Sequence, residues 1–285
     1  MNSDVLRPIT AAEVEIFDRE GVVRLAGLFD PGWIELLKSG LNRNLHNPTE
    51  RARVWDRDEA GHTMFYDSQA WQRIDEYRRF VFESPAARIA AELMRSSMIN
   101  FFFDAVFVRS PGTQFSTPWH QDEPYWSVEG YNTCSIWMPL VPVSAANCLS
   151  FVPGSHRGTK VLAQYNFGIL NPDGQTRVDQ VDFTGFAEDS FPDIDADPER
   201  WGVVSWDLEP GDCIAFNSRM MHGGSGKLPS DVGLEVFTTK WLGDDVWVKF
   251  RECGMDPDHT EVMIAAGLQP GDRPEGALYP RVWNS

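Results

Sequence analysis

The stretch Pro118-Trp119-His120-Gln121-Asp122 carries the most informative spacing in the chain. His120 and Asp122 are separated by one residue, so at the end of an extended strand both side chains leave the same face. An imidazole and a carboxylate in this arrangement supply two adjacent ligands to one metal ion. A His-x-Asp pair also occurs by chance in many proteins, as two unrelated polar residues of a loop. The pair therefore needs a third ligand to become informative.

His222 is the candidate for that third ligand. It follows a turn and the short apolar stretch 213–216, which predicts that it too lies at a strand end. The chain has only six histidines, so few are available for incidental roles. Two histidines and one carboxylate with open positions opposite them form the ligand set of non-haem Fe(II) oxygenases. Aromatic residues surround the first histidine, as in a mostly apolar pocket: Phe115, Trp119, Tyr125 and Trp126.

Composition limits the classes of partner. The 285 residues carry a net charge of −17, which argues against nucleic acid and against an anionic membrane surface. A local pair of cations could still bind an anionic small molecule. The four cysteines are far apart in the sequence, which favours reduced thiols. The start of the chain shows no secretory pattern and no apolar stretch reaches 18 residues, so we expect a cytoplasmic protein that acts on a small molecule. Nothing in the sequence indicates an oligomeric state.

The periodicity of apolar residues predicts a helical flank followed by a β-rich core. Thr10 and Glu13 form a capping-box pattern, and helices are expected after it, over 31–41, and over 77–98 with a second half starting at Pro85. Short strands with turn signals then favour a sandwich or barrel. The strands are expected at 21–25, 63–66, 99–109, 133–140, 149–152, 201–205, 213–216 and 234–242. We predict one domain, 1–285, with a helical flank (1–98), a core (99–250) and a C-terminal extension (251–285).

Five motifs appear in a fixed order between residues 100 and 250. They are Thr117-Pro-Trp-His-Gln-Asp122, Ile136-Trp-Met-Pro-Leu140, Phe151-Val-Pro-Gly-Ser-His156, His222-Gly-Gly224 and Trp241-Leu-Gly-Asp-Asp245. Together they resemble the phytanoyl-CoA dioxygenase family. The resemblance implies a mainly β fold with flanking helices around a double-stranded β-helix (jelly-roll, cupin-like) core. It also implies Fe(II) held by the two histidines and Asp122, 2-oxoglutarate and O2 as co-substrates, and oxidation of a small organic metabolite.

Other residues receive expected roles from this comparison. His156 lies in a Gly-Ser-His turn and is expected to be structural. Arg109 and Thr117 are candidates for contacts to anionic groups. Four aromatic residues are candidate walls of the pocket, Trp137 beside the co-substrate and three beside the substrate, although each could equally be a core residue: Phe103, Tyr125, Trp126 and Trp137.

One expected residue is missing. Members of the family normally anchor the distal carboxylate of 2-oxoglutarate with an Arg on the strand after the second His. No Arg lies between His222 and Trp241, and alignment on the last motif places Glu235 at that position, or Leu234 if the register slips by one. A glutamate there would face a carboxylate, and at about 4 Å with an effective dielectric near 20 the repulsion is on the order of 4 kcal/mol.

Three hypotheses accommodate the missing Arg. Another cation could replace it, the candidates being Arg109, Lys227, Lys240 and Arg219. The enzyme could instead use a different oxo acid or none, or the protein could be a metal-binding jelly roll without oxygenase turnover. Arg109 is the best of the substitutes, because it ends the long strand before the His-x-Asp motif, although it could also be an ordinary surface residue.

Overall fold

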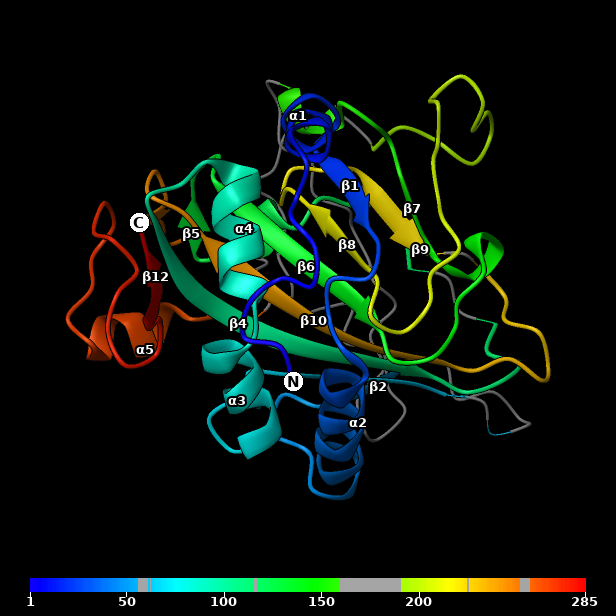
Figure 1. Cartoon of the computed structure of the whole chain (residues 1–285), viewed down its shortest axis with the longest axis horizontal. Helices are drawn as coiled ribbons and strands as arrows, with labels where there is room; N and C mark the ends of the chain where they lie inside the picture. Colours follow the sequence, from blue (N-terminus) through cyan, green and yellow to red (C-terminus); the bar gives the residue numbers. More distant parts are fainter. Residues whose placement is uncertain (56–60, 62, 115–116, 159–190, 225, 252–256) are drawn as a thin grey trace.

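A large antiparallel sheet forms the centre of the computed structural model, which describes residues 1–285 except 56–60, 62, 115–116, 159–190, 225 and 252–256 (Figure 1). Within the described residues this sheet has eight strands, in the order β1-β8-β6-β10-β4-β3-β2, with β12 paired to β4. Their bounds are β1 Val22–Leu25, β2 Arg53–Trp55, β3 Met64–Ser68, β4 Met98–Arg109, β6 Thr133–Pro139, β8 Cys213–Phe216, β10 Leu234–Leu242 and β12 Arg281–Asn284.

Two small strand pairs accompany the large sheet in the described residues. Strand β7 (Leu149–Phe151) pairs with β9 (His222–Gly224), and β5 (Val128–Glu129) pairs with β11 (Trp247–Val248). His120 forms an isolated bridge with His222, which brings the His-x-Asp segment against β9. The predicted mainly β architecture with flanking helices is confirmed.

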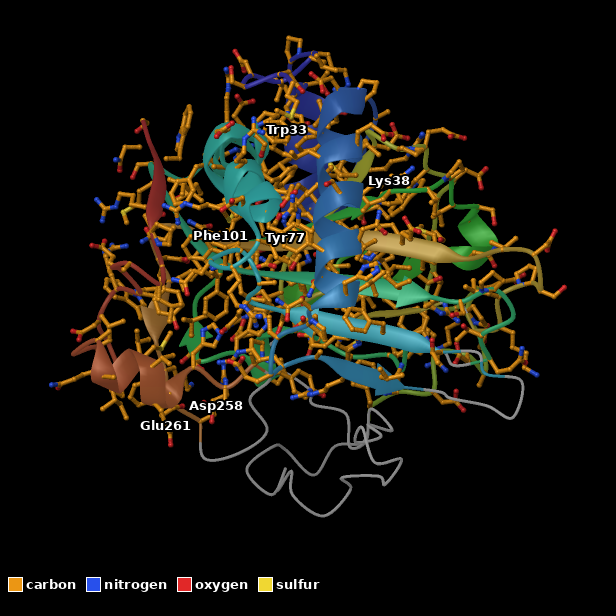
Figure 2. The ribbon with its side chains drawn as sticks, turned by 90° about the horizontal axis from the view of Figure 1, so that it is seen from below. Trp33, Lys38, Tyr77, Phe101, Asp258 and Glu261 are labelled. Atoms are coloured by element: carbon orange, nitrogen blue, oxygen red, sulfur yellow. The ribbon has the colours of Figure 1, made fainter. Side chains whose placement is uncertain are left out.

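Four of the described helices pack against the outer face of the large sheet (Figures 1 and 2). They are α1 (Ala11–Glu20), α2 (Pro31–His46), α3 (Asp75–Glu83) and α4 (Ala86–Met94). Helix α5 (Thr260–Ala265) lies apart from them, and its Met263 belongs to a separate cluster with Phe102 and Trp126. Three single-turn 3-10 helices are η1 (Glu123–Tyr125), η2 (Ala145–Asn147) and η3 (Ser155–Arg157). The predicted capping box of α1 is present. The helix expected over 77–98 is two helices, and the second ends at Met94 because Arg95 adopts φ 50°.

Alternation along β10 divides its side chains between two environments. Phe237 lies 4.7 Å from Tyr77 and 5.3 Å from Phe80 between ring centroids, so it belongs to the core shared with the helices. Trp241 packs edge-on against Phe101 in the same core, and Figure 2 shows Phe101 and Tyr77 near the helical layer. Because successive residues of a strand point to opposite faces, the even-numbered residues of β10 face the interior of the β structure.

The prediction of a strand at 201–205 is wrong. Only Val204 pairs there, in an isolated bridge that exchanges both backbone hydrogen bonds with Phe151. Residues 199–202 form a turn closed by the Gly202 N–H to the Glu199 carbonyl, so the apolar residues after it have no continuous partner strand.

The chain ends take part in the central sheet. Strand β1 pairs with β8, and β12 pairs with β4. The division into flank, core and extension stays a prediction. None of the helices in the described residues is long and apolar enough to cross a membrane.

Gly40 lets α2 approach α3 closely. A Cβ at this position would lie 2.7 Å from Cε1 of Tyr77 and 3.0 Å from Cβ of Glu76. Gly40→Ala is therefore expected to lower the free energy of unfolding by about 1–3 kcal/mol through overpacking. Urea denaturation measures this, with Glu35→Ala on the exposed side of the same helix as the control, expected within about 0.5 kcal/mol of wild type. Stabilisation by Gly40→Ala, as helix propensity alone predicts, would contradict the close packing.

Candidate active site

His120, Asp122 and His222 converge at one point. The two histidines are opposite each other in an antiparallel pair, where each backbone N–H donates to the other's carbonyl at 2.9 Å. Their ring centroids are 4.1 Å apart. Asp122 Oδ1 lies 3.5 Å from His120 Nε2 and 3.7 Å from His222 Nε2. The His-x-Asp pair and the distant histidine therefore meet as the sequence predicts.

Backbone carbonyls orient both imidazoles. His120 Nδ1 lies 2.8 Å from the Pro118 carbonyl, and His222 Nδ1 lies 2.9 Å from the Met220 carbonyl. Because a carbonyl only accepts, Nδ1–H is the donor in each ring, which leaves both Nε2 lone pairs turned toward Asp122. Ser135 Oγ donates to the other Asp122 oxygen, Oδ2, at 3.3 Å. Contacts of this kind fix the tautomer and direction of metal ligands.

The charge states suit a cation. Burial, with the neighbouring His120, lowers the pKa of His222 to about 3, so its imidazole is neutral at ordinary pH. Burial acts to raise the pKa of Asp122, but the neighbouring His120 and His222 side chains and the Lys240 ammonium outweigh it and hold this pKa well below its usual value. Metal binding requires neutral imidazole and ionised carboxylate. The three donor atoms lie within 4.8 Å of one another, and bonds of about 2 Å would let one ion contact all of them.

A cavity opens beside these three residues. Its walls come from the inner faces of β3, β4, β6, β8 and β10 and from the segments that carry the histidines. Five residues expected at the site line it: Phe103, Thr117, Tyr125, Trp126 and Trp137. Phe115 lies outside the described residues. His156 is buried elsewhere, with Nε2 3.2 Å from the Asp18 carbonyl, and does not line the cavity.

Two cations reach the cavity from the large sheet. Arg109 at the end of β4 is 5 % exposed and donates to the Gly226 carbonyl. Its direct neighbour across the strands is Leu234, which also lines the cavity. Lys240 is 7 % exposed and lies near the other end of β10. Leu234, opposite Arg109, and Lys240 are six positions apart along β10, which corresponds to roughly 20 Å.

The prediction that Glu235 faces the co-substrate is wrong. Leu234, Val236, Thr238 and Lys240 are the residues of β10 that line the cavity, so Glu235 lies on the opposite face, where it is partly exposed. The antiparallel register with β4 and β6 sets this, because a shift of one residue reverses every side chain of a strand. The expected repulsion between Glu235 and a co-substrate carboxylate therefore does not arise.

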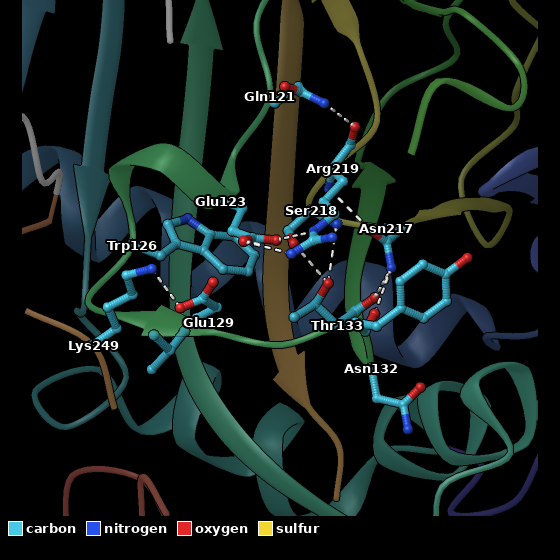
Figure 3. A network of polar contacts seen from close by, with 12 residues as sticks. Gln121, Glu123, Trp126, Glu129, Asn132, Thr133, Asn217, Ser218, Arg219 and Lys249 are labelled. Atoms are coloured by element: carbon cyan, nitrogen blue, oxygen red, sulfur yellow. Dashed lines mark hydrogen bonds and ion pairs between the residues drawn. The ribbon is translucent and has the colours of Figure 1, made fainter. Parts of the chain in front are cut away.

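Two other candidate cations are excluded. Arg219 is engaged with Glu123, with Nε 2.5 Å from Oε2 and Nη2 3.0 Å from Oε1 (Figure 3). The Gln121 amide also donates to the Arg219 carbonyl at 2.5 Å. This network ties the segment after the first histidine to the segment before the second. Lys227 is exposed and does not line the cavity.

Several lining residues have no counterpart in the sequence-based prediction. Ser135, which holds Asp122, was not anticipated, and neither were Thr238, Phe216 and Cys148, which line the cavity. Strand alternation could have selected those on β6, β8 and β10, but only once the parity of each strand was known. Burial raises the pKa of the Cys148 thiol to about 11, so it adds no charge to the cavity.

Comparison with known proteins decides the family. The family model for phytanoyl-CoA dioxygenase matches residues 17–229. The chain belongs to the phytanoyl-CoA dioxygenase family. It is thus an enzyme of the Fe(II)/2-oxoglutarate dioxygenase type, with iron, 2-oxoglutarate and O2 as its cofactors and co-substrates.

Curated relatives of this phytanoyl-CoA dioxygenase family member are also dioxygenases. An ectoine dioxygenase from Sphingopyxis alaskensis is 25% identical over 239 residues, which cover 78% of this chain and 72% of the relative. The dioxygenase FrzG from Cladobotryum is 24% identical over 237 residues, which cover 76% and 69% of the two chains.

Comparison with solved structures establishes the jelly-roll fold of this protein. The carbocyclase SnoK from nogalamycin biosynthesis, described as α-ketoglutarate dependent, superimposes with a TM-score of 0.72 at 20% identity over 99% of this chain and 100% of its own. The epimerase SnoN from the same biosynthesis gives 0.71 at 21% identity, with 96% of each chain covered. At these identities the likeness concerns the fold alone. The predicted double-stranded β-helix core is confirmed.

Proposed function

We propose that this dioxygenase binds Fe(II) through His120, Asp122 and His222 and oxidises a C–H bond of a small organic metabolite. The convergence of two imidazoles, that of His222 being neutral, and one carboxylate at the wall of an apolar cavity is the observation that carries this proposal. Three protein ligands leave coordination positions open for a 2-oxo acid and O2. The iron, when bound, supplies the centre at which those two react and the substrate is oxidised.

Arg109 is the proposed anchor for the distal carboxylate of 2-oxoglutarate. The family carries an Arg on the strand after the second His, and of the two candidate positions in this chain, Glu235 and Leu234, only Leu234 lines the cavity. Arg109 is the cross-strand neighbour of Leu234, and side chains at such positions have Cβ atoms about 5 Å apart. The guanidinium of Arg109, from β4, can thus occupy the space that the family's Arg fills from the neighbouring strand. Its burial strengthens the pairing with a carboxylate.

The remaining residues of the cavity hold and shield the reactants. Ser135 and the carbonyls of Pro118 and Met220 keep the three ligands in their orientations. The aromatic walls exclude water from the reacting centre and leave an apolar surface for the substrate. A cytoplasmic location and the absence of nucleic-acid and membrane partners stay predictions from composition.

A metal-binding jelly roll without oxygenase turnover is the alternative, favoured by Leu234 at the position of the expected Arg. Anaerobic titration of the Fe(II)-loaded protein with 2-oxoglutarate separates the two. The chelate of Fe(II) with the 2-oxo acid absorbs visible light, so our proposal predicts a new band that saturates, followed by succinate release on addition of O2. Stoichiometric iron without that band would support the alternative.

A further inference from the structure

Lys240 is a buried cation inside the cavity that the functions proposed above leave unused. It points inward from β10, and its two neighbours across the strands are Phe103 and Ser135. Its ammonium lies 5.9 Å from the ring centroids of both Phe103 and Phe216, and Nζ donates to Thr238 Oγ1 at 2.8 Å. Within the described part of the chain, that hydroxyl is its sole hydrogen-bond partner, and no carboxylate is paired with it.

When the cavity holds iron and 2-oxoglutarate, the positive charge of Lys240 is not balanced by another charge among the described lining residues. The charged side chains among the described lining residues are Asp122, Arg109 and Lys240. A ferrous ion and a 2-oxoglutarate dianion cancel each other, and Asp122 and Arg109 do the same. Among these described residues, the Lys240 ammonium is then the one charge that no other charge balances. A buried charge without a partner is costly, so a ligand that brings one negative charge gains affinity there.

Lys240 is also separated from the co-substrate anchor. Arg109 belongs to the Leu234 end of β10, whereas Lys240 stands beside Ser135, the residue that contacts Asp122. Burial lowers the pKa of Lys240, and the nearby Asp122 carboxylate opposes that effect. The ammonium therefore lies on the metal side of the cavity, where the substrate must present its C–H bond.

We propose that Lys240 recognises a single negatively charged oxygen group, such as a carboxylate, on the primary substrate. This rests on the proposed function and specifies its substrate class: a monoanionic organic acid whose apolar or aromatic body contacts the walls formed by Tyr125 and Trp126. The Thr238 hydroxyl and the rings of Phe103 and Phe216, over which the ammonium lies, place it for that contact.

Calorimetric binding to the intact protein, loaded anaerobically with Fe(II) and 2-oxoglutarate, tests this. The probes are three acids of graded length, phenylacetate, 3-phenylpropionate and 4-phenylbutyrate, each compared with its neutral amide. For the best-fitting pair, the wild type is expected to bind the acid about 10- to 100-fold more tightly than the amide. Lys240→Met should abolish that preference and leave the Kd of the amide within about twofold.

The control variant and the folding check are matched to this change. Lys249→Met makes the same substitution at a lysine that pairs on the surface with Glu129, outside the cavity, and should keep the preference for the acid (Figure 3). Replacing a buried charge by an apolar side chain of similar volume is often neutral or stabilising, so Lys240→Met is expected to fold. Thermal unfolding verifies that.

Three results would overturn the assignment. The wild type could show no preference for the acid in any of the three pairs, or Lys240→Met could retain the preference. Weaker binding of 2-oxoglutarate in Lys240→Met, without loss of the acid preference, would make Lys240 a co-substrate residue. This binding test does not depend on turnover. If the wild type prefers acids to amides through Lys240 but forms no chelate band, the proposed function is contradicted and the role of Lys240 is not.

Discussion

His222→Ala is expected to weaken Fe(II) binding by at least about 100-fold and to reduce succinate release to background. The estimate follows from the 10- to 100-fold losses that changes outside the ligand shell already cause. Removal of a ligand itself leaves two donors, and the neutral Nε2 that faces Asp122 is lost. Equilibrium dialysis under anaerobic conditions measures the affinity, and succinate formation measures turnover.

Two further variants make this result interpretable. His222 also packs against Phe216 and Phe151, with ring centroids 4.7 and 5.8 Å away, so its removal changes packing as well as ligation. Asp122→Asn conserves volume and removes only the negative charge, and the same loss of iron is expected. His46→Ala, at an exposed site at the end of α2, should leave iron affinity and turnover unchanged. Wild-type iron affinity in both His222→Ala and Asp122→Asn would refute the proposed metal centre.

Arg109→Leu is expected to raise the Kd of 2-oxoglutarate by about 30- to 1000-fold, the range for truncating one partner of a buried charge pair. The physical reason is that the distal carboxylate would lose a buried guanidinium and meet an apolar wall of Leu234 and Met64. The chelate band of the Fe(II)-loaded protein reports this Kd directly, so the measurement does not depend on an unknown substrate.

Moving the Arg across the strand pair gives a sharper test. The double variant Arg109→Leu/Leu234→Arg restores the arrangement typical of the family, because the two positions are direct neighbours in the sheet. We expect it to recover most of the affinity lost in Arg109→Leu. Glu235→Arg places the same guanidinium on the opposite face of β10 and should leave the Kd unchanged. A gain of affinity in Glu235→Arg, with none in the double variant, would show that the co-substrate is bound elsewhere.

Local patterns explain which parts of the site could be predicted from the sequence. His120 and Asp122 are two residues apart, and the period of a strand guarantees that they share a face wherever that strand lies. The capping box of α1 is likewise confined to a few residues. Of the described aromatic residues close to His120 in the sequence, Tyr125 and Trp126 line the cavity and Trp119 does not. Each of these inferences needs only the immediate neighbourhood of the residue.

The errors concern strands whose partners are distant in the sequence. The apolar segment 201–205 has the composition of a strand but finds only one paired residue, Val204. Glu235 was placed on the wrong face because alternation gives two possible parities, and the sequence of β10 has large apolar residues on both faces. Whether segment 201–205 forms a strand, and which face of β10 carries Glu235, both depend on the strands that lie beside these segments.

By itself, the sequence indicated the family through five ordered motifs, the β-rich core through short apolar strands with turn signals, and His120 and Asp122 through a spacing that holds in any packing of the strands. It indicated His222 through its position after a short apolar strand. Only the tertiary structure decided which cations enter the cavity. Arg109 and Lys240 face inward because β10 is held in register between β4 and β6, and a register differing by one residue would have turned Glu235 inward instead. That choice depends on contacts between strands that are distant in the sequence, which no local pattern encodes.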